Sequence, residues 1–180
     1  MAGRNIQTSI FTNFSSGLQA VKMKHFVCLC TLFLFISCDG IQESKKIDKD
    51  RITEEVKDML FDYHKAIAKD GLTAEFDYLD QSSDFFWVPP GYRTTLNYDS
   101  VQNILQQNAK IFRSIEFQWN VPQVYPLSNE IASYSGLVVG HMIDTLGIET
   151  KVSLIESGTL IKRQSGWKLL NDQSAILDVE

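Results

Sequence analysis

Apolar residues recur at steps of three and four positions through the segment 52–67, and this spacing predicts a helix with one apolar stripe. Asp50 or Thr53 is placed to cap the start of this helix, and Gly71 is placed to end it. The stripe consists of Ile52, Val56, Met59, Leu60, Tyr63 and Ile67.

Two shorter helices are expected further along the chain. Thr73 is placed to cap the first of them, which carries Phe76 and Leu79. The pair Asp99 and Gln102 resembles a capping box and opens the second. One face of that helix is formed by Val101, Ile104, Leu105, Asn108 and Phe112.

Strand-like patterns fill the rest of the domain. Residues 84–88 form an aromatic run, and the turn-forming sequence Pro-Pro-Gly at 89–91 ends it. Short turns between long strands imply an antiparallel arrangement, so the expected fold class is α+β, with three N-terminal helices packed on a curved, mainly antiparallel sheet. Period-two alternation predicts four strands after Ser114, over residues 115–126, 130–144, 148–163 and 166–178.

The N-terminal segment has a different character. A basic stretch at 22–25 precedes an apolar run at 26–36, in which only Thr31 is polar. At about 1.5 Å per helical residue the run is too short to cross a hydrocarbon core of about 30 Å. It fits the core of a secretory signal. Residues 35–38, Phe-Ile-Ser-Cys, resemble the lipobox of bacterial lipoproteins, although Phe35 stands where leucine is usual.

These features predict a cleaved signal over residues 1–37 and a lipid on the thiol of Cys38. Residues 1–21 are polar and patternless, so we interpret Met23 as the true start of the protein and residues 1–22 as a misassigned start. Two alternatives remain open for the apolar run. It is either part of an ordinary cleaved signal without a lipid or an ordinary buried segment.

The remaining chain divides into a tether and one domain. Residues 38–51 are rich in Lys, Asp, Glu and Ser, which is typical of a solvated tether, and residues 52–180 form the domain. Hydrophobic residues make up 44% of the chain and charged residues 22%, as in ordinary globular proteins. Cys28, Cys30 and Cys38 are the only cysteines, so the domain contains no disulfide, thiol nucleophile or cysteine metal site.

Charge narrows the range of partners. The chain carries 17 basic and 22 acidic residues, a net charge of −5. Removal of residues 1–37 would take away Arg4, Lys22 and Lys24 but no acidic residue, which leaves 14 basic residues against 22 acidic ones and a net charge of −8. This balance opposes contact with nucleic acid phosphates or with an anionic membrane surface, so no nucleic-acid partner is expected.

Three stretches of the domain carry a family resemblance: residues 84–91 (DFFWVPPG), 127–132 (LSNEIA) and 157–170 (SGTLIKRQSGWKLL). With the order of elements over residues 52–178, they resemble the nuclear-transport-factor-2-like superfamily, which includes ketosteroid isomerases and polyketide-cyclase-like proteins. The resemblance implies a cone, in which the sheet curls around a pocket and the helices close it. It implies little about activity, because one fold hosts many functions.

The resemblance also suggests which side chains face the pocket. Alternation on the last strand separates Trp167, Leu169, Asn171 and Gln173 from Lys168, Leu170, Asp172 and Ser174, and by resemblance the first set faces inward. Core packing is the alternative role for the three tryptophans. The expected lining consists of Tyr63, Trp87, Trp119, Trp167, Asn171 and Gln173, with Phe85, Tyr134 and His141 as further candidates.

The sequence lacks the carboxylate that usually acts as the base in the isomerases it resembles. Isomerases that this chain resembles carry a carboxylate base just before a proline at the end of the first strand, and Val88 stands there. The remaining catalytic candidates are His64, Asp144 and Asp172. The alternative for each of them is a structural or exposed role without catalysis. The sequence shows no metal-ligand spacing, phosphate-binding loop or dinucleotide motif, so we expect no metal and no cofactor.

These observations predict a lipid-anchored protein of the cell envelope of a Gram-negative-type bacterium, on the periplasmic or surface side. Its membrane contact is the lipid on Cys38, and its cone binds a small hydrophobic ligand or a partner without catalysis. The alternative is an isomerase, cyclase or hydratase that acts on a small hydrophobic carbonyl compound. A homodimer through the outer face of the sheet is a third expectation.

Overall fold

The computed structural model of the protein describes residues 46–179. The signal at 1–37, the lipidated Cys38 and most of the tether lie outside the described residues, so these features stay predictions. Within the described part, no helix is long and apolar enough to cross a membrane.

The first described helix, α2, spans Lys49–Asp70 and buries the predicted stripe. It begins inside the segment predicted as a tether, because the side chain of Asp48 caps it by accepting a hydrogen bond from the backbone N–H of Arg51. The caps predicted at Asp50 and Thr53 are therefore wrong. Gly71 ends the helix as predicted, with a φ of +81° that a glycine adopts without strain.

Two short helices follow, with caps that differ from the prediction. The first, η1 (Leu72–Asp77), is a 3₁₀-helix whose start has no side-chain cap, so the cap predicted at Thr73 is wrong. The second, α3 (Tyr98–Asn108), is capped by Asn97, which accepts from the N–H of Ser100. The predicted capping box at Asp99 therefore lies two residues too late.

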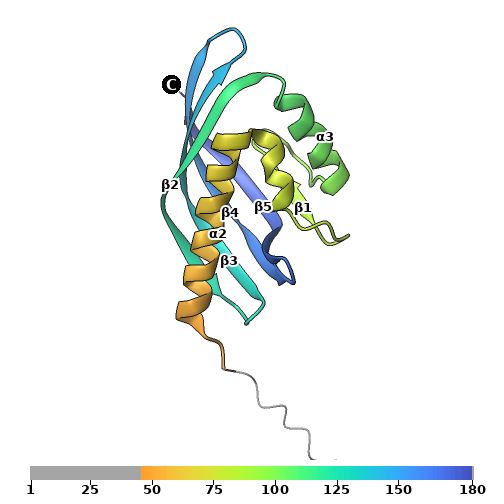
Figure 1. Cartoon of the computed structure of the whole chain (residues 1–180), viewed down its shortest axis with the longest axis vertical. Coiled ribbons are helices and arrows are strands. Elements are labelled where there is room, and N and C mark those ends of the chain that lie inside the picture. The colour runs from red at the N-terminus through yellow and green to blue at the C-terminus, as the bar shows by residue number, and fades with distance from the viewer. Residues whose placement is uncertain (1–45, 180) are drawn as a thin grey trace, which may run out of the picture. The chain divides into compact units, whose positions relative to one another are not determined.

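A five-stranded sheet completes the domain, in the order β1-β5-β4-β3-β2. All neighbours run antiparallel except β1 and β5, which run parallel. The predicted α+β class, with helices on a curved and mainly antiparallel sheet, is confirmed (Figure 1). The strands are β1 (Phe86–Val88), β2 (Phe112–Pro126), β3 (Ile131–Asp144), β4 (Glu149–Arg163) and β5 (Gly166–Val179).

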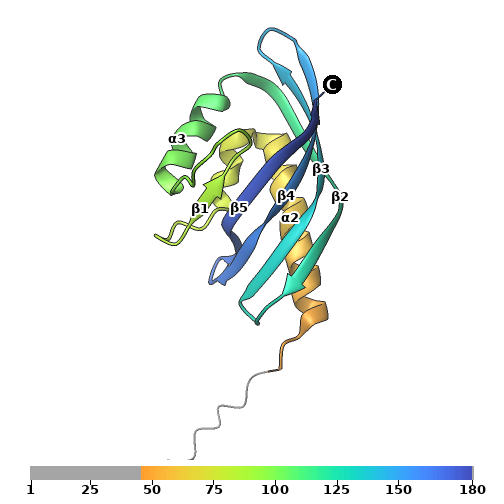
Figure 2. The same ribbon diagram turned by 180° about the vertical axis from the view of Figure 1, so that it is seen from behind.

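The helices lie on one face of the sheet, which we call the inner face. In Figure 1, α2 runs across this face, and α3 and η1 lie over the end opposite to the start of α2. Seen from behind, the outer face carries no helix of the described part (Figure 2). The core lies between the helices and the inner face, and its most buried members include Ile52, Val56, Leu60, Ile67, Val101, Tyr134, Leu160 and Leu169.

A bulge in β5 changes which side chains face the core. Leu160 pairs with Leu169, but the preceding Thr159 pairs with Asn171, so Leu170 is an extra residue. Alternation shifts by one position at this point. Trp167 and Leu169 are buried before the bulge, whereas Asp172 and Ser174 are buried after it. The prediction that Asn171 and Gln173 face inward is therefore wrong, because strict alternation does not continue through a bulge.

Candidate functional site

A cavity of about 420 Å³ lies between the helices and the inner face of the sheet. This volume falls within the range of about 300–1,000 Å³ that is typical of small-molecule sites. Apolar and aromatic side chains form most of its wall, from α2, α3 and every strand. They include Tyr63, Leu72, Trp87, Pro89, Pro90, Val101, Ile104, Leu105, Phe112, Ile115, Phe117, Met142, Val152, Leu154 and Ile176.

Ionisable side chains interrupt this apolar wall. Glu75 of η1, Glu156 of β4 and His64 of α2 line the cavity, and Ser174 of β5 lies opposite Glu156 in the sheet register. Asp172 is buried at the inward position of β5 that precedes Ser174. We call Glu75, Glu156 and Asp172 the acid cluster; the charges of these groups act on one another.

Tyrosine and serine hydroxyls hold two members of the acid cluster in place. The hydroxyl of Tyr63 donates to Glu75 Oε2 at 2.6 Å. Asp172 accepts from the Tyr134 hydroxyl at 2.6 Å and from Ser174 Oγ at 3.1 Å. These short contacts fix both carboxyls, because a buried carboxyl without partners would carry a large desolvation penalty.

Burial raises the pKa of all three carboxyls in the acid cluster. It raises the pKa of Glu75 to about 8, against the opposing hydrogen bond from Tyr63. It raises the pKa of Asp172 to about 6, because the hydroxyl of Tyr134 offsets part of the penalty. The pKa of Glu156 is also raised well above its ordinary value, by burial first and then by the charges of Asp172 and Glu75.

Residues 46–179 place no lysine or arginine in the cavity wall beside this cluster. The described chain also contains no group of His, Cys, Asp and Glu side chains that could hold a metal ion. The carboxyls are therefore kept neutral or held by hydroxyls instead of being paired with a cation.

His64 lies beside the cluster in an aromatic setting. Its ring stacks on Trp119 at 5.0 Å and 8°, and its Nε2 lies 4.0 Å from Glu156 Oε2. Burial lowers the pKa of His64 to about 4, so the ring is neutral near pH 7. Its Nδ1 is buried without a hydrogen-bond partner, and His64 lines the cavity.

A glycine makes room for the Tyr134–Asp172 contact. Gly158 of β4 lies between Tyr134 and Asp172 in the sheet register. A Cβ at this position would lie 2.9 Å from Cε1 of Tyr134 and would overlap the carbonyl oxygen of Asn171. Only glycine therefore lets the Tyr134 ring lie across β4 toward the carboxyl.

A second hollow lies outside the cavity, between α2 and β2. It has a volume of about 380 Å³ and is more polar than the cavity. His64 borders both spaces, so its ring forms part of the wall between them. We call this hollow the outer groove, and it is lined by Phe61, His64, Lys65, Ala68, Glu116, Phe117, Gln118 and Trp119.

The structure brings some of the predicted site residues together and separates others. Tyr63, His64 and Trp87 line the cavity, and Asp172 lies in the acid cluster. Asp144 lies in the β3–β4 turn, where its Oδ1 accepts from two backbone N–H groups at 2.8 Å. It therefore shapes a turn and contributes nothing to the cavity.

The other predicted pocket residues lie elsewhere. Trp119 borders the outer groove and donates from Nε1 to the carbonyl of Leu60 at 3.2 Å. His141 has a side chain 40% exposed and lies near Glu149. Four further candidates also lie outside the cavity lining: Phe85 and Tyr134 in the core, and Asn171 and Gln173 on the opposite side of β5.

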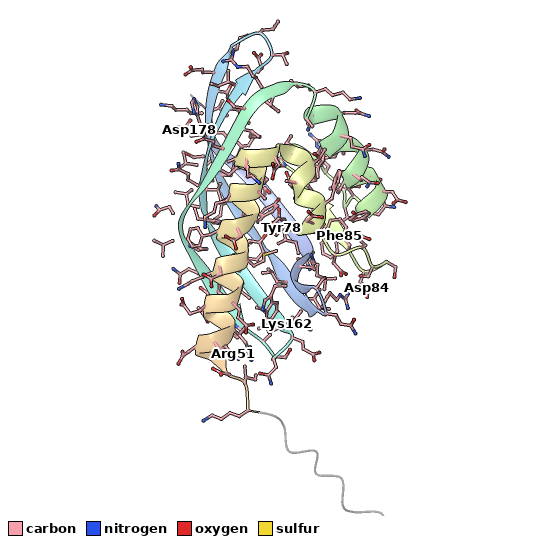
Figure 3. The ribbon with its side chains drawn as sticks, in the orientation of Figure 1. Arg51, Tyr78, Asp84, Phe85, Lys162 and Asp178 are labelled. Atoms are coloured by element: carbon pink, nitrogen blue, oxygen red, sulfur yellow. The ribbon has the colours of Figure 1, made fainter. Side chains whose placement is uncertain are left out.

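Trp167 belongs to a polar contact near the start of α2. Its Nε1 donates to Glu55 Oε2 at 2.9 Å, and Lys162 donates to the same oxygen at 2.6 Å. Arg51 donates to the other oxygen of Glu55 at 2.5 Å. Arg51 and Lys162 lie together at this end of the sheet, far from Asp178 (Figure 3). The role predicted for Trp167 as a pocket residue is therefore wrong.

Sequence reasoning missed Glu75 and Glu156. Glu156 follows Val152 and Leu154 at inward-facing steps of two, and a charged residue in such a series is a readable signal of a buried site. Glu75 gives no comparable signal, because a glutamate in a short helix is usually exposed.

No protein-family model matches the chain. A search of curated proteins also finds no match. Solved structures do match it. A protein assigned as a scytalone dehydratase, from Novosphingobium aromaticivorans, aligns with a TM-score of 0.63 at 13% identity, covering 71% of this chain and 85% of its own.

Two further structures give the same result. A nuclear transport factor 2-like superfamily protein from Salmonella enterica aligns with a TM-score of 0.60 at 14% identity, covering 69% of this chain and 90% of its own. A hexachlorocyclohexane dehydrochlorinase from Novosphingobium barchaimii aligns with a TM-score of 0.57 at 9% identity, covering 71% and 87%. The chain therefore has the nuclear-transport-factor-2-like fold that its sequence resembles.

Proposed function

We propose that the domain binds a small, mostly apolar molecule in the cavity, with the polar group of that molecule at the acid cluster. One observation carries this proposal. An apolar cavity of about 420 Å³ meets buried carboxyls that have no cation from the protein beside them. Such groups lower stability, and sites that break the ordinary rules of burial are commonly functional.

Binding of a neutral apolar dye tests this proposal. The chain with Cys38→Ser, which can carry no lipid, is titrated with N-phenyl-1-naphthylamine, whose fluorescence rises in apolar surroundings. Ile104→Trp adds bulk to the cavity wall on α3 and is expected to weaken dye binding at least about tenfold. Leu146→Trp adds similar bulk at an exposed site in the turn between β3 and β4 and is expected to leave binding unchanged. Equal binding by both variants would refute the proposal.

A second candidate function is proton transfer on a small hydrophobic carbonyl compound, as in an isomerase, cyclase or hydratase. The pairing of His64 with Glu156 favours it, because a neutral imidazole beside a protonated carboxyl offers a base and an acid. A dehydratase-type protein and a dehydrochlorinase are among the structures with this fold. Val88, at the end of β1, offers no base, so His64 would have to serve.

Hydrogen exchange on a ketone tests the catalytic candidate. We expect the protein to speed the exchange of α-hydrogens of 4-phenyl-2-butanone in D₂O, followed by NMR, and His64→Gln to abolish the effect. The Glu116→Gln variant, changed at an exposed side chain of β2, serves as the control. Exchange at the rate of buffer alone would leave the domain with a binding role only.

We also propose that the protein is held in the cell envelope by the lipid predicted on Cys38. The supporting features are the basic stretch at 22–25, the apolar run at 26–36 and the lipobox-like residues 35–38. Mass spectrometry of protein extracted from membranes is expected to find an acylated cysteine as the first residue. Recovery of an unmodified Cys38 in the mature chain would refute this proposal.

A homodimer through the outer face of the sheet is proposed on similar grounds. Val139 of β3 and Ile155 of β4 are each 44% exposed, and Leu177 of β5 is 59% exposed. These apolar residues belong to the neighbouring strands β3, β4 and β5, whose outer face no described helix covers (Figure 2). Sedimentation of the Cys38→Ser chain is expected to show a dimer that Ile155→Asp dissociates, and a strict monomer at high concentration would contradict the proposal.

A further inference from the structure

The charge of the cavity lining favours one class of ligand. Its ionisable lining consists of Glu75, Glu156 and His64, with Tyr63 beside Glu75 and with Asp172 behind Ser174. His64 is neutral near pH 7, and the other ionisable groups of this set can carry only a negative charge. The cavity lining within the described residues includes no lysine or arginine. A carboxylate or phosphate ligand would therefore bring a second negative charge into a buried acidic site.

The hydrogen-bonding groups of the cavity that have no described partner also favour a cationic ligand. Glu156 accepts no hydrogen bond from any described side chain, and Nε2 of the neutral His64 lies 4.0 Å from its Oε2. His64 is only 4% exposed, and its Nδ1 has no partner. Together with Glu75, these residues place three acceptor-bearing side chains around one space. A primary ammonium group has three N–H donors, which matches this set in number.

Aromatic rings complete the surroundings. Tyr63, Trp87, Phe112 and Phe117 line the same cavity. The faces of such rings attract cations. Carboxyls combined with rings in an apolar wall suit an amine with a hydrophobic body better than they suit a neutral alcohol, because only the amine supplies the charge that the protein omits.

We infer that the ligand of this cavity is a hydrophobic amine, bound as its ammonium cation with the nitrogen between Glu75 and Glu156. This inference rests on the proposed binding function and names the class of ligand. The cation stabilises the ionised form of the carboxyls, so its binding drives a proton from Glu156 or Glu75 into solvent. His64 and Tyr63 line the same space, and Asp172 lies behind Ser174. The neutral His64 accepts a hydrogen bond from the ammonium group.

Three probes with the same hydrophobic body test the inference. Binding of 4-phenylbutylamine, 4-phenylbutanol and 4-phenylbutyrate to the Cys38→Ser chain is measured by calorimetry near pH 7. We expect the amine to bind at least about tenfold more tightly than the alcohol, and the carboxylate to bind more weakly than both. Heats measured in two buffers with different ionisation enthalpies are expected to show proton release for the amine and none for the alcohol.

Substitutions in the acid cluster test whether it causes the preference for the amine over the alcohol. Glu156→Gln is expected to reduce the preference for the amine over the alcohol to about twofold or less. Glu75→Gln gives the same test if Glu156→Gln fails to fold. Glu116→Gln, at an exposed position of β2, is the matched control and is expected to keep the full preference.

The outcomes separate this inference from the binding proposal. An alcohol that binds as tightly as the amine would overturn the inference, as would a preference that survives both cluster variants. Either result leaves the cavity as a binding site for neutral molecules. Failure of every probe, together with failure of N-phenyl-1-naphthylamine, would instead remove the binding proposal itself.

Discussion

Glu75→Gln is the substitution whose effect on stability follows most directly from the structure. Burial raises the pKa of Glu75 from 4.5 to about 8. A carboxyl with a raised folded-state pKa contributes stability that is complete below the unfolded pKa and is lost as pH rises toward the folded value. Each pKa unit corresponds to about 1.4 kcal/mol, so the difference of about 3.5 units sets an upper bound of about 5 kcal/mol.

The Glu75→Gln variant removes this loss of stability at high pH. Glutamine has nearly the same shape, stays neutral at every pH and can still accept the hydrogen bond from Tyr63 through its carbonyl oxygen. Near pH 5, where Glu75 is protonated, we expect the two proteins to differ by less than about 1 kcal/mol. Near pH 9 we expect the variant to be more stable by about 2 to 4 kcal/mol, because the parent must bury an ionised carboxylate.

Urea unfolding followed by tryptophan fluorescence measures both values. The Cys38→Ser chain serves as the parent, and the free energy of unfolding is compared at about pH 5, 7 and 9. Glu116→Gln, at an exposed position, is expected to change little at any of the three pH values. A difference between Glu75→Gln and the parent that is the same at pH 5 and pH 9 would refute the claim that Glu75 is buried in its neutral form.

Three further substitutions test other contacts. Tyr134→Phe removes a donor from Asp172 and is expected to destabilise the fold by about 1–3 kcal/mol in urea unfolding, more near pH 8 than near pH 4, because the hydroxyl holds the ionised carboxylate. Gly158→Ala is expected to lower the melting temperature by several degrees, whereas the neighbouring exposed Ser157→Ala leaves it nearly unchanged; equal effects would contradict the close approach at Gly158. The hydrogen bonds from Lys162 and then from Trp167 lower the pKa of Glu55 to about 2. Glu55→Gln is therefore expected to lower the free energy of unfolding by about 1 kcal/mol at pH 7, and by less as pH falls from 4.5 toward 2. A loss of stability that does not change with pH would contradict this contact.

Much of the fold follows from periodicity. The stripe through 52–67 and the alternation after Ser114 predict α2 and the four long strands, because both patterns reflect burial on one face. The helix caps do not follow in the same way. Asp48 and Asn97 act as caps where nearby polar residues offered equally good choices, and only the backbone conformation decides between them.

The site is harder to predict from the sequence than the fold is. Tyr63, His64 and Trp87 could be predicted from position in their elements, but the inward turn of Asp172 depends on the extra residue Leu170. A one-residue bulge leaves no mark in a pattern of mixed polar and apolar residues. Glu75 reaches the cavity only because η1 folds back beneath α3, which is a tertiary fact that local sequence does not contain.

A crystal structure with the tightest-binding phenylbutyl probe tests the central claim most directly. The account predicts probe density inside the cavity, with the phenyl ring among the apolar residues of α3 and the polar end within hydrogen-bond distance of Glu156. Density confined to the outer groove between α2 and β2, or a probe whose polar end points away from the acid cluster, would contradict it.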